Sequence, residues 1–281
     1  MRTGVFAEQD SHVHVTSRRV LLDSSEPLPE PLGGAVVPAG GTPAEVARVV
    51  RAALRQHGAA VVELAELLSD DDFRAFGTHL GTAMPETDPA VQPFVTDGVI
   101  LNLVTRHAHT ADISLQPFAE NSLSLHTEGS GRTAGQQPRY IVLMCQDPGA
   151  NPASAQTVLV PMSAVLHRLS PEHQAVLSRT RYAHLPAGET ILRAHEGRAV
   201  FSFRDFFHDK LEWVNEAGDS AEVVDQALQE LLSAMYAAGA VGVHWRRGLL
   251  VVVDNTYFFH GRTAGVSSPA HPRHLKRLRL H

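Results

Sequence analysis

The sequence has only one cysteine among its 281 residues, so no disulfide can form within the chain. Cys145 lies in the apolar run 141–145, where we expect a packed core thiol. No apolar run approaches the length of a membrane helix, and the first fifteen residues lack the apolar segment of a signal peptide. These absences predict a cytoplasmic protein without disulfides and without a membrane partner.

An excess of basic residues is also lacking. The chain has 24 Lys and Arg against 30 Asp and Glu, a net charge of −6. A nucleic-acid-binding surface usually requires a basic patch or a high pI, so we expect no nucleic-acid partner. Hydrophobic residues make up 43% of the chain, which is enough for a sizeable core. We expect residues 1–35, rich in proline and glycine, to form an irregular lead-in, and residues 36–281 to form a single domain.

The local patterns predict a mainly β protein with flanking helices. Thr42 and Pro43 open a helix that Gly58 ends, and a buried strand is expected over 59–64. Further helices are expected over 70–80, from Pro171 toward Arg179, and over 221–238. From about Val95 onward, short apolar runs alternate with turn residues, as in a sandwich or barrel. The expected strands are 99–105, 122–128, 139–146, 157–161, 199–204, 249–254 and 274–279. Helices outside short strands indicate a jelly roll of two facing sheets.

Three residues are candidate metal ligands. His126 and Glu128 form an H-x-E pair, and residues i and i+2 of a strand point to the same face. His260 closes a distant apolar run that begins at Leu249. Two imidazoles and one carboxylate on one side of an ion are typical of non-heme Fe(II) oxygenases. The chain has 17 histidines, most of which we expect to be surface or hydrogen-bonded residues. A zinc site or a metal-free barrel is the alternative interpretation.

Arg273 follows His260 by thirteen residues, on what we expect to be the next strand. A guanidinium can hold a dicarboxylate by paired, charge-assisted hydrogen bonds. A surface arginine at the end of the chain is the simpler alternative.

These motifs, in this order, resemble the taurine dioxygenase-like family of Fe(II)/2-oxoglutarate oxygenases, and within it the clavaminate-synthase-like branch of arginine and asparagine hydroxylases. The resemblance spans roughly Val36 to the C-terminus. It is carried by segments 43–64, 73–81, 126–128, 254–262 and 273–277, with Glu128 at a position where aspartate is commoner. It implies a double-stranded β-helix, or jelly roll, with Fe(II) bound between the sheets by His126, Glu128 and His260 as the catalytic centre.

The resemblance also implies roles for other residues. Arg273 would bind the C5 carboxylate of 2-oxoglutarate, and Thr157 would donate its hydroxyl to the same group. Arg277, Asp205 and Glu128 would contact the substrate, with Arg277 pairing with its carboxylate. For Arg277 a structural ion pair is an equal alternative, and for Thr157 an ordinary position in a sheet.

For neighbouring residues we expect structural roles. We expect Lys276 and Arg279 to be solvated and Arg262 to form a structural ion pair. Asp254 and Asn255 are expected to shape a turn or to hydrogen-bond a ligand residue. The glycine-rich loop 129–135 fits either a mobile lid or a plain surface loop.

The resemblance implies that the enzyme hydroxylates a free amino acid or a similar small metabolite, in specialised metabolism such as antibiotic biosynthesis. Fe(II) would use O2 and 2-oxoglutarate, releasing succinate and CO2, and the protein would mainly orient the substrate and exclude water. Relatives that halogenate have a small residue where Glu128 stands, which argues against halogenation. Desaturation, cyclisation, a zinc hydrolase and a non-catalytic jelly roll remain open.

Overall fold

The computed structural model describes residues 1–31, 34–107, 109, 110, 112, 114–151, 154–206, 210–266, 268 and 270–281. The described helices are α1 Val13–Leu22, α2 Pro43–His57, α3 Asp70–Thr78, α4 Met162–Leu166, α5 Pro171–Leu177 and α6 Ala221–Ala237, with 3-10 turns η1 Gln92–Phe94, η2 Gln116–Phe118 and η3 Ala134–Gln136. The first eight strands are β1 Arg2–Ala7, β2 Gly34–Val37, β3 Ala59–Leu64, β4 Val95–Thr96, β5 Ile100–Val104, β6 Leu123–His126, β7 Tyr140–Asp147 and β8 Thr157–Pro161. The remaining strands are β9 Thr180–Tyr182, β10 Leu192–His195, β11 Arg198–Phe201, β12 Lys210–Asn215, β13 Val241–Val243, β14 Leu249–Asp254, β15 Phe258–Arg262 and β16 His274–Leu280.

Two sheets face each other and enclose an apolar layer. The larger sheet has the order β2-β3-β14-β7-β16-β5-β4, and the smaller has the order β13-β8-β15-β6. Only β2 and β3 pair in parallel; the other pairs in these sheets are antiparallel. Alternate residues of β14 point to opposite faces, so Val251 and Val253 pack between the sheets. Leu250 and Val252 pack on the outer face. The mainly β architecture with flanking helices is therefore confirmed.

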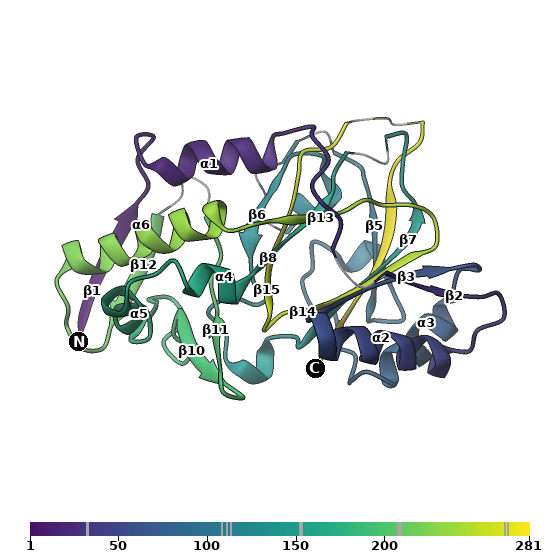
Figure 1. Ribbon diagram of the computed structural model, residues 1–281, viewed down its shortest axis with the longest axis horizontal. Coiled ribbons are helices and arrows are strands. Elements are labelled where there is room, and N and C mark those ends of the chain that lie inside the picture. Colours follow the sequence, from purple (N-terminus) through teal and green to yellow (C-terminus); the bar gives the residue numbers. More distant parts are fainter. Residues whose placement is uncertain are drawn as a thin grey trace.

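Helices α2 and α3 cover the outer face of the larger sheet (Figure 1). Thr42 caps α2 in a reciprocal capping box with Glu45, and Gly58 ends the helix with a left-handed φ of 70°. The bounds predicted for this helix and for β3 are confirmed. Helix α3 ends at Thr78, two residues before the predicted end. Cys145 is fully buried between the sheets, and burial raises the pKa of its thiol to about 12, as expected of a packed core thiol.

The first 35 residues contain regular structure, so the irregular lead-in expected there is wrong. β1 pairs with β12, in a small sheet that continues to β9, and α1 packs on α6 at one end of the molecule (Figure 1). The apolar side chains of Phe6, Val15 and Leu22 are buried, which explains why this segment folds onto the rest. The division of the chain at residue 36 stays a prediction.

A buried ionic cluster connects this N-terminal segment to the smaller sheet. Arg18 of α1 donates to both carboxylate oxygens of Asp205 at 2.7 and 2.8 Å and to those of Glu8 at 2.9 and 2.7 Å. The Tyr236 hydroxyl of α6 donates to Asp205 and accepts from the Leu125 N–H at 3.2 Å. The cluster therefore reaches β6, the strand that ends at His126.

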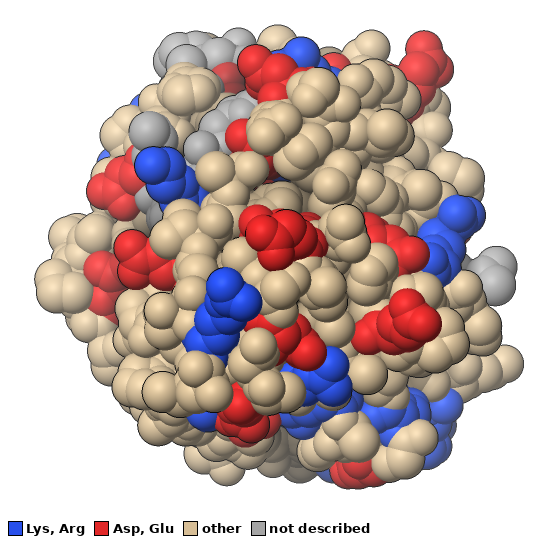
Figure 2. Space-filling model, turned by 90° about the vertical axis from the view of Figure 1, so that its left-hand side faces the viewer, with Lys and Arg blue, Asp and Glu red and all other residues tan. Residues whose placement is uncertain are grey.

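The end of the molecule formed by these elements has a mixed surface charge. Acidic and basic side chains are interspersed over it, without a large patch of one sign (Figure 2). No helix in the described part of the chain is both long and apolar enough to cross a membrane.

We predict that Arg18→Met lowers the free energy of unfolding by about 3 kcal/mol, because it leaves buried carboxylates without their counter-charge. Urea denaturation followed by circular dichroism measures this change. Arg74→Met is the control, because Arg74 forms an exposed ion pair with Asp71 and should leave the stability nearly unchanged. Equal, small effects of both substitutions would contradict a stabilising role for the cluster.

Candidate metal centre

His126 and His260 stand opposite each other on neighbouring strands. The register of β6 and β15 pairs the two residues directly, so their side chains project from the same face. Their ring centroids lie 4.2 Å apart. Both residues are on the inner face of the smaller sheet, and they line a pocket between the two sheets.

The apolar run 249–260 contains parts of two strands: β14, as predicted over 249–254, and β15, which carries His260 and is not among the predicted strands. β14 belongs to the larger sheet and β15 to the smaller one. The turn between them is stabilised by Asp254, whose carboxylate accepts from the N–H of Thr256 at 2.8 Å and from its hydroxyl. Through this turn the chain crosses from one sheet to the other before it reaches His260.

Glu128 is positioned by a side chain from this turn rather than by a strand. β6 ends at His126, so Glu128 lies in the following turn, not on the strand predicted for it. Asn255 accepts from the Glu128 N–H at 2.9 Å and donates to the Glu128 carbonyl at 3.1 Å. Its amide also donates to the Pro138 carbonyl at 3.0 Å. Asn255 thus has the hydrogen-bonding role expected of it.

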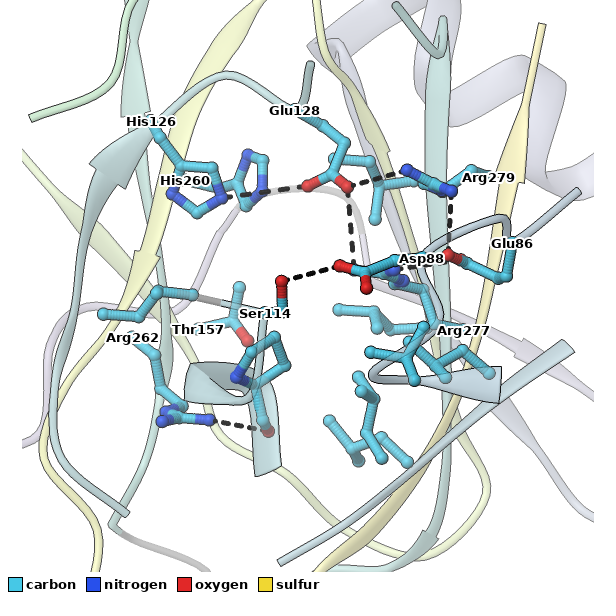
Figure 3. A pocket seen from close by; sticks show the side chains of 18 of the residues that line it. Glu86, Asp88, Ser114, His126, Glu128, Thr157, His260, Arg262, Arg277 and Arg279 are labelled. Carbon is cyan, nitrogen blue, oxygen red and sulfur yellow. Dashed lines mark hydrogen bonds and ion pairs between the residues drawn. The ribbon is translucent and has the colours of Figure 1, made fainter. Parts of the chain in front are cut away.

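The three side chains converge on one point in the pocket (Figure 3). One candidate ligand atom from each of His126, Glu128 and His260 lies within 4.8 Å of the others. His126 Nε2 and Glu128 Oε2 are 3.8 Å apart. Within the described residues, this is the one group of three or more metal-ligating side chains that meets so closely.

The protonation states of the group suit a divalent metal ion. Burial lowers the pKa of His126 well below 6.5, and the neighbouring His260 and Arg204 lower it further. Burial also lowers the pKa of His260 to about 4. Burial would raise the pKa of Glu128, but Arg277 and Arg279 bring it to about 2. At neutral pH the group therefore presents two neutral imidazoles and a carboxylate.

The hydrogen bonds of the imidazoles also fit metal binding. His126 Nδ1 lies 2.8 Å from the Ser124 carbonyl oxygen, which assigns a proton to Nδ1 and leaves the lone pair on Nε2, facing Glu128. His260 Nδ1 is buried and has no hydrogen-bond partner in the described part of the chain. A buried polar nitrogen without a hydrogen-bond partner raises the free energy of the folded protein. Binding of a metal ion at this site would offset that cost.

The pocket that contains this group has a volume of about 330 Å³. Apolar side chains from the inner face of the larger sheet form one part of its wall: Leu101, Leu103, Ile141, Leu143 and Leu275. The rest is strongly charged, with six arginines and three acidic residues. None of the described residues that line it is Phe, Tyr or Trp.

Arg273 and Thr157 line this same pocket. Arg273 is 8% exposed, and its Nη1 donates to the Ala155 carbonyl at 3.1 Å. In the part of the chain that the structure describes, no carboxylate lies within 4.0 Å of its guanidinium. Burial lowers the pKa of Arg273 to about 10. Thr157 lies on β8, opposite Arg262 of β15.

Arg277 and Arg279 project into the pocket from β16. Both pair with the carboxylate of Glu86, through Arg277 at 2.9 Å and Arg279 at 2.8 Å. They also lie 3.7 and 3.3 Å from Glu128 Oε1. Residues two apart on a strand share a face, so Arg279 is not the solvated residue expected. Lys276, on the other face, is not free either, because it pairs with Asp70.

Asp205 does not reach the pocket, so its predicted contact with the substrate is wrong. Its carboxylate is fully buried and engaged by Arg18 and Tyr236. The preceding residue, Arg204, lines the pocket instead. Neighbouring residues of an extended chain point to opposite sides, so a shift of one position exchanges core and pocket. The segment does reach the pocket, but through Arg204 and not through Asp205.

Arg262 forms no ion pair with a described carboxylate, which corrects another expectation. Its guanidinium donates to the carbonyls of Gln116 at 3.0 Å, Pro117 at 3.1 Å and Asn121 at 2.7 Å. Arg262 therefore holds the η2 segment against the pocket wall.

The glycine-rich loop after Glu128 packs against the protein. The Gly131 N–H donates to the Ser202 hydroxyl at 2.8 Å. A Cβ on Gly131, whose φ is +76°, would meet the Tyr182 ring at 2.4 Å. From this loop, Arg132 extends to the pocket.

Comparison with known proteins identifies the family. The sequence model of the taurine catabolism dioxygenase TauD, TfdA family matches residues 24–279. The chain belongs to this family. A search of curated proteins gave no match.

Solved structures of similar fold support the architecture of this TauD/TfdA family member. The PvcB protein of Pseudomonas aeruginosa matches with a TM-score of 0.64 and 22% sequence identity, over 93% of each chain. The non-heme iron oxygenase OrfP matches with a TM-score of 0.63 and 18% identity, over 84% of this chain and 79% of its own. Asparagine oxygenase (AsnO) matches with a TM-score of 0.57 and 16% identity, over 84% and 78%. The jelly-roll fold expected from the resemblance is confirmed, with two sheets that do not close into a barrel.

We predict that Asn255→Ala weakens Fe(II) or Co(II) binding by about 10-fold, because Glu128 loses the hydrogen bonds that fix its backbone. Anaerobic titration followed by visible spectroscopy measures the metal Kd. Asn102→Ala is the control: Asn102 is half-buried, and like Asn255 it donates side-chain hydrogen bonds, to the Phe94 carbonyl at 3.1 Å and to the Thr96 hydroxyl at 3.0 Å. If the folded Asn255 variant binds metal as tightly as the control does, Asn255 does not position Glu128.

Proposed function

We propose that the protein is an Fe(II)/2-oxoglutarate-dependent dioxygenase that hydroxylates an unactivated C–H bond of a small, amino-acid-like metabolite. The observation that carries this proposal is one pocket with two features. It contains the His126, Glu128 and His260 group, and it contains Arg273, a buried guanidinium without a carboxylate partner among the described residues. A zinc hydrolase would have no use for such an arginine.

Arg273 and Thr157 fit the distal carboxylate of 2-oxoglutarate. A buried charge without a counter-charge costs several kcal/mol, so the pocket is stabilised when an anion occupies it. Arg273 can donate two parallel hydrogen bonds to a carboxylate, and the Thr157 hydroxyl can add a third. Leu103, Leu143 and Leu275 line the same pocket and suit the methylene groups of the cosubstrate.

His126, Glu128 and His260 would hold Fe(II), which supplies the activation of O2 and the oxidation of the C–H bond when 2-oxoglutarate is bound. The contribution of the protein is to bind and orient. Asn255 fixes the backbone of Glu128, and the Ser124 carbonyl fixes the orientation of the His126 ring. Because Glu128 occupies the carboxylate position, hydroxylation is proposed rather than halogenation.

For the substrate, Arg277 and Glu86 offer both signs of charge at one place. Arg277 would pair with a carboxylate and Glu86 with an ammonium group, which together suit the zwitterionic head of an amino acid. A pocket of about 330 Å³ that also receives 2-oxoglutarate leaves space for a metabolite of amino-acid size.

The solved structures of similar fold are consistent with the proposed reaction. PvcB is described as an Fe, alpha-ketoglutarate dependent oxygenase from an isonitrile synthetic pathway. AsnO was solved with Fe(II), 3-hydroxyasparagine and succinate, and OrfP with Fe and alpha-ketoglutaric acid and with hydroxy-L-Arg. These proteins support an amino-acid-like substrate and a setting in specialised metabolism.

We predict that anaerobic addition of Fe(II) and 2-oxoglutarate produces a weak visible charge-transfer band. His126→Ala should abolish this band by removing a metal ligand. Arg273→Met should leave Fe(II) binding intact but weaken 2-oxoglutarate binding by at least 10-fold, because the distal carboxylate loses charge-assisted hydrogen bonds.

The control for Arg273→Met is Arg247→Met, which removes a positive charge from the exposed turn between β13 and β14. It should leave the band and the 2-oxoglutarate Kd unchanged. A normal band in both His126→Ala and Arg273→Met would refute the proposed site.

A further inference from the structure

Arg204 is a pocket arginine to which the proposed reaction assigns no partner. Arg204 lines the pocket and is half-buried, and its side chain donates to the Gln116 amide oxygen at 2.8 Å. Burial lowers the pKa of Arg204. Among the described residues, no carboxylate lies within 4.0 Å of its guanidinium. Arg277 and Arg279, in contrast, are each paired with Glu86.

The backbone fixes where the side chain of Arg204 points. Arg204 forms an antiparallel bridge with His126, and His126 pairs on its other side with His260. Directly opposed residues of antiparallel strands project from the same face with their Cβ atoms about 5 Å apart. His260, His126 and Arg204 therefore form one transverse row across the inner face of the smaller sheet. Arg277 and Arg279 come from β16 in the opposite sheet.

The charge of Arg204 acts on the metal centre directly. Arg204 lies beside His126, and both residues line the pocket. A positive charge beside a site that must accept a divalent cation raises the free energy of the occupied site. An anion bound to Arg204 would offset this repulsion.

The geometry points to Arg204, with Gln116, as the subsite for an anionic group at the distal end of the substrate. The substrate would then be an amino acid, or a derivative of one, whose side chain ends in a carboxylate. This inference rests on the proposed function, and it adds the charge class of the substrate. Arg277 and Glu86 would receive the zwitterionic head from one sheet, while Arg204 would bind the tail from the other.

Three features support this division. The guanidinium of Arg204 can donate to a carboxylate from the nitrogens that Gln116 leaves free, because one fork carries five donors. Among the described residues that line the pocket, none is aromatic, so they offer no stacking surface for an aromatic tail. The described lining of the pocket has six arginines and three acidic residues. This excess of positive charge favours an anionic substrate over a cationic one.

The test measures substrate binding to the enzyme loaded with Fe(II) and saturating 2-oxoglutarate under anaerobic conditions. The probes are L-aspartate and L-glutamate, with the neutral isosteres L-asparagine and L-glutamine and the cationic L-lysine. Isothermal titration calorimetry gives the Kd, and the shift of the charge-transfer band reports that the probe enters the iron site. An acidic probe should bind at least 10-fold more tightly than its neutral isostere.

Two variants address Arg204 itself. Arg204→Met removes the charge, and Gln116→Glu keeps the arginine but places a carboxylate where the amide oxygen now lies, 2.8 Å away. Each should weaken binding of the acidic probe roughly 10- to 100-fold and leave the neutral isostere unaffected. Both should bind Fe(II) at least as tightly as the wild type, because a repulsive charge is removed or neutralised. Arg168→Met, which removes an exposed charge that does not line the pocket, is the control.

The outcomes separate this inference from the proposed function. If the wild type forms no charge-transfer band, the proposed function fails. If the band forms but neither acidic probe shifts it, or a neutral isostere binds equally well, the inference about Arg204 is overturned. Equal losses for acidic and neutral probes in both variants would also overturn it, because Arg204 would then bind the common amino-acid head.

Discussion

The direct pairing of β6 with β15 is the constraint on which the site depends. It sets His126 opposite His260, and the bridge to Arg204 extends the same row across the inner face. Register in a sheet with one buried face is strongly specified, because a slip of one residue turns every side chain to the other side. The apolar neighbour Leu125, which is fully buried on the outer face, therefore helps to place both imidazoles in the pocket.

The N-terminal segment supports this register from outside. Tyr236 accepts a hydrogen bond from the Leu125 N–H and donates to Asp205, which is held by Arg18 of α1. The same cluster fixes the residue after Arg204. His126 follows Leu125 and Arg204 precedes Asp205, so two of the three residues in the row are adjacent in sequence to this buried cluster. The N-terminal strand and helix, which by composition look like a lead-in, are part of the support of the metal centre.

Regular patterns in the sequence predicted the regular parts of the fold. The bounds of α2, β3, β8 and β14 follow from capping residues and runs of apolar side chains, because these signals are local. β15 was missed because a three-residue turn divides one continuous apolar run, and the strands on its two sides join different sheets. α1 was missed because its burial depends on contacts with α6, more than 200 residues later.

Within the site, the metal ligands and Arg273 could be found by spacing, whereas the charged partners could not. Glu86 lies about 190 residues before the arginines that it pairs with, and no local pattern connects them. Asp205 and Arg204 are adjacent, so only the strand pairing decides which one faces the pocket. The bridge to His126 was the missing information.

The charges around Glu128 determine how metal binding and substrate binding affect each other. Glu128 lies between His126 and the two arginines of β16, and its pKa of about 2 keeps it ionised throughout the physiological range. Glu128 would coordinate a metal through Oε2, the oxygen that faces His126, and its coordination would release no proton. Its other oxygen, Oε1, could stay with Arg277 and Arg279. A divalent cation held there would add positive charge to a pocket in which arginines already outnumber acidic residues. Loading the metal thus increases the positive charge available for recognising an anionic group, so the metal and an anionic substrate should each favour the binding of the other.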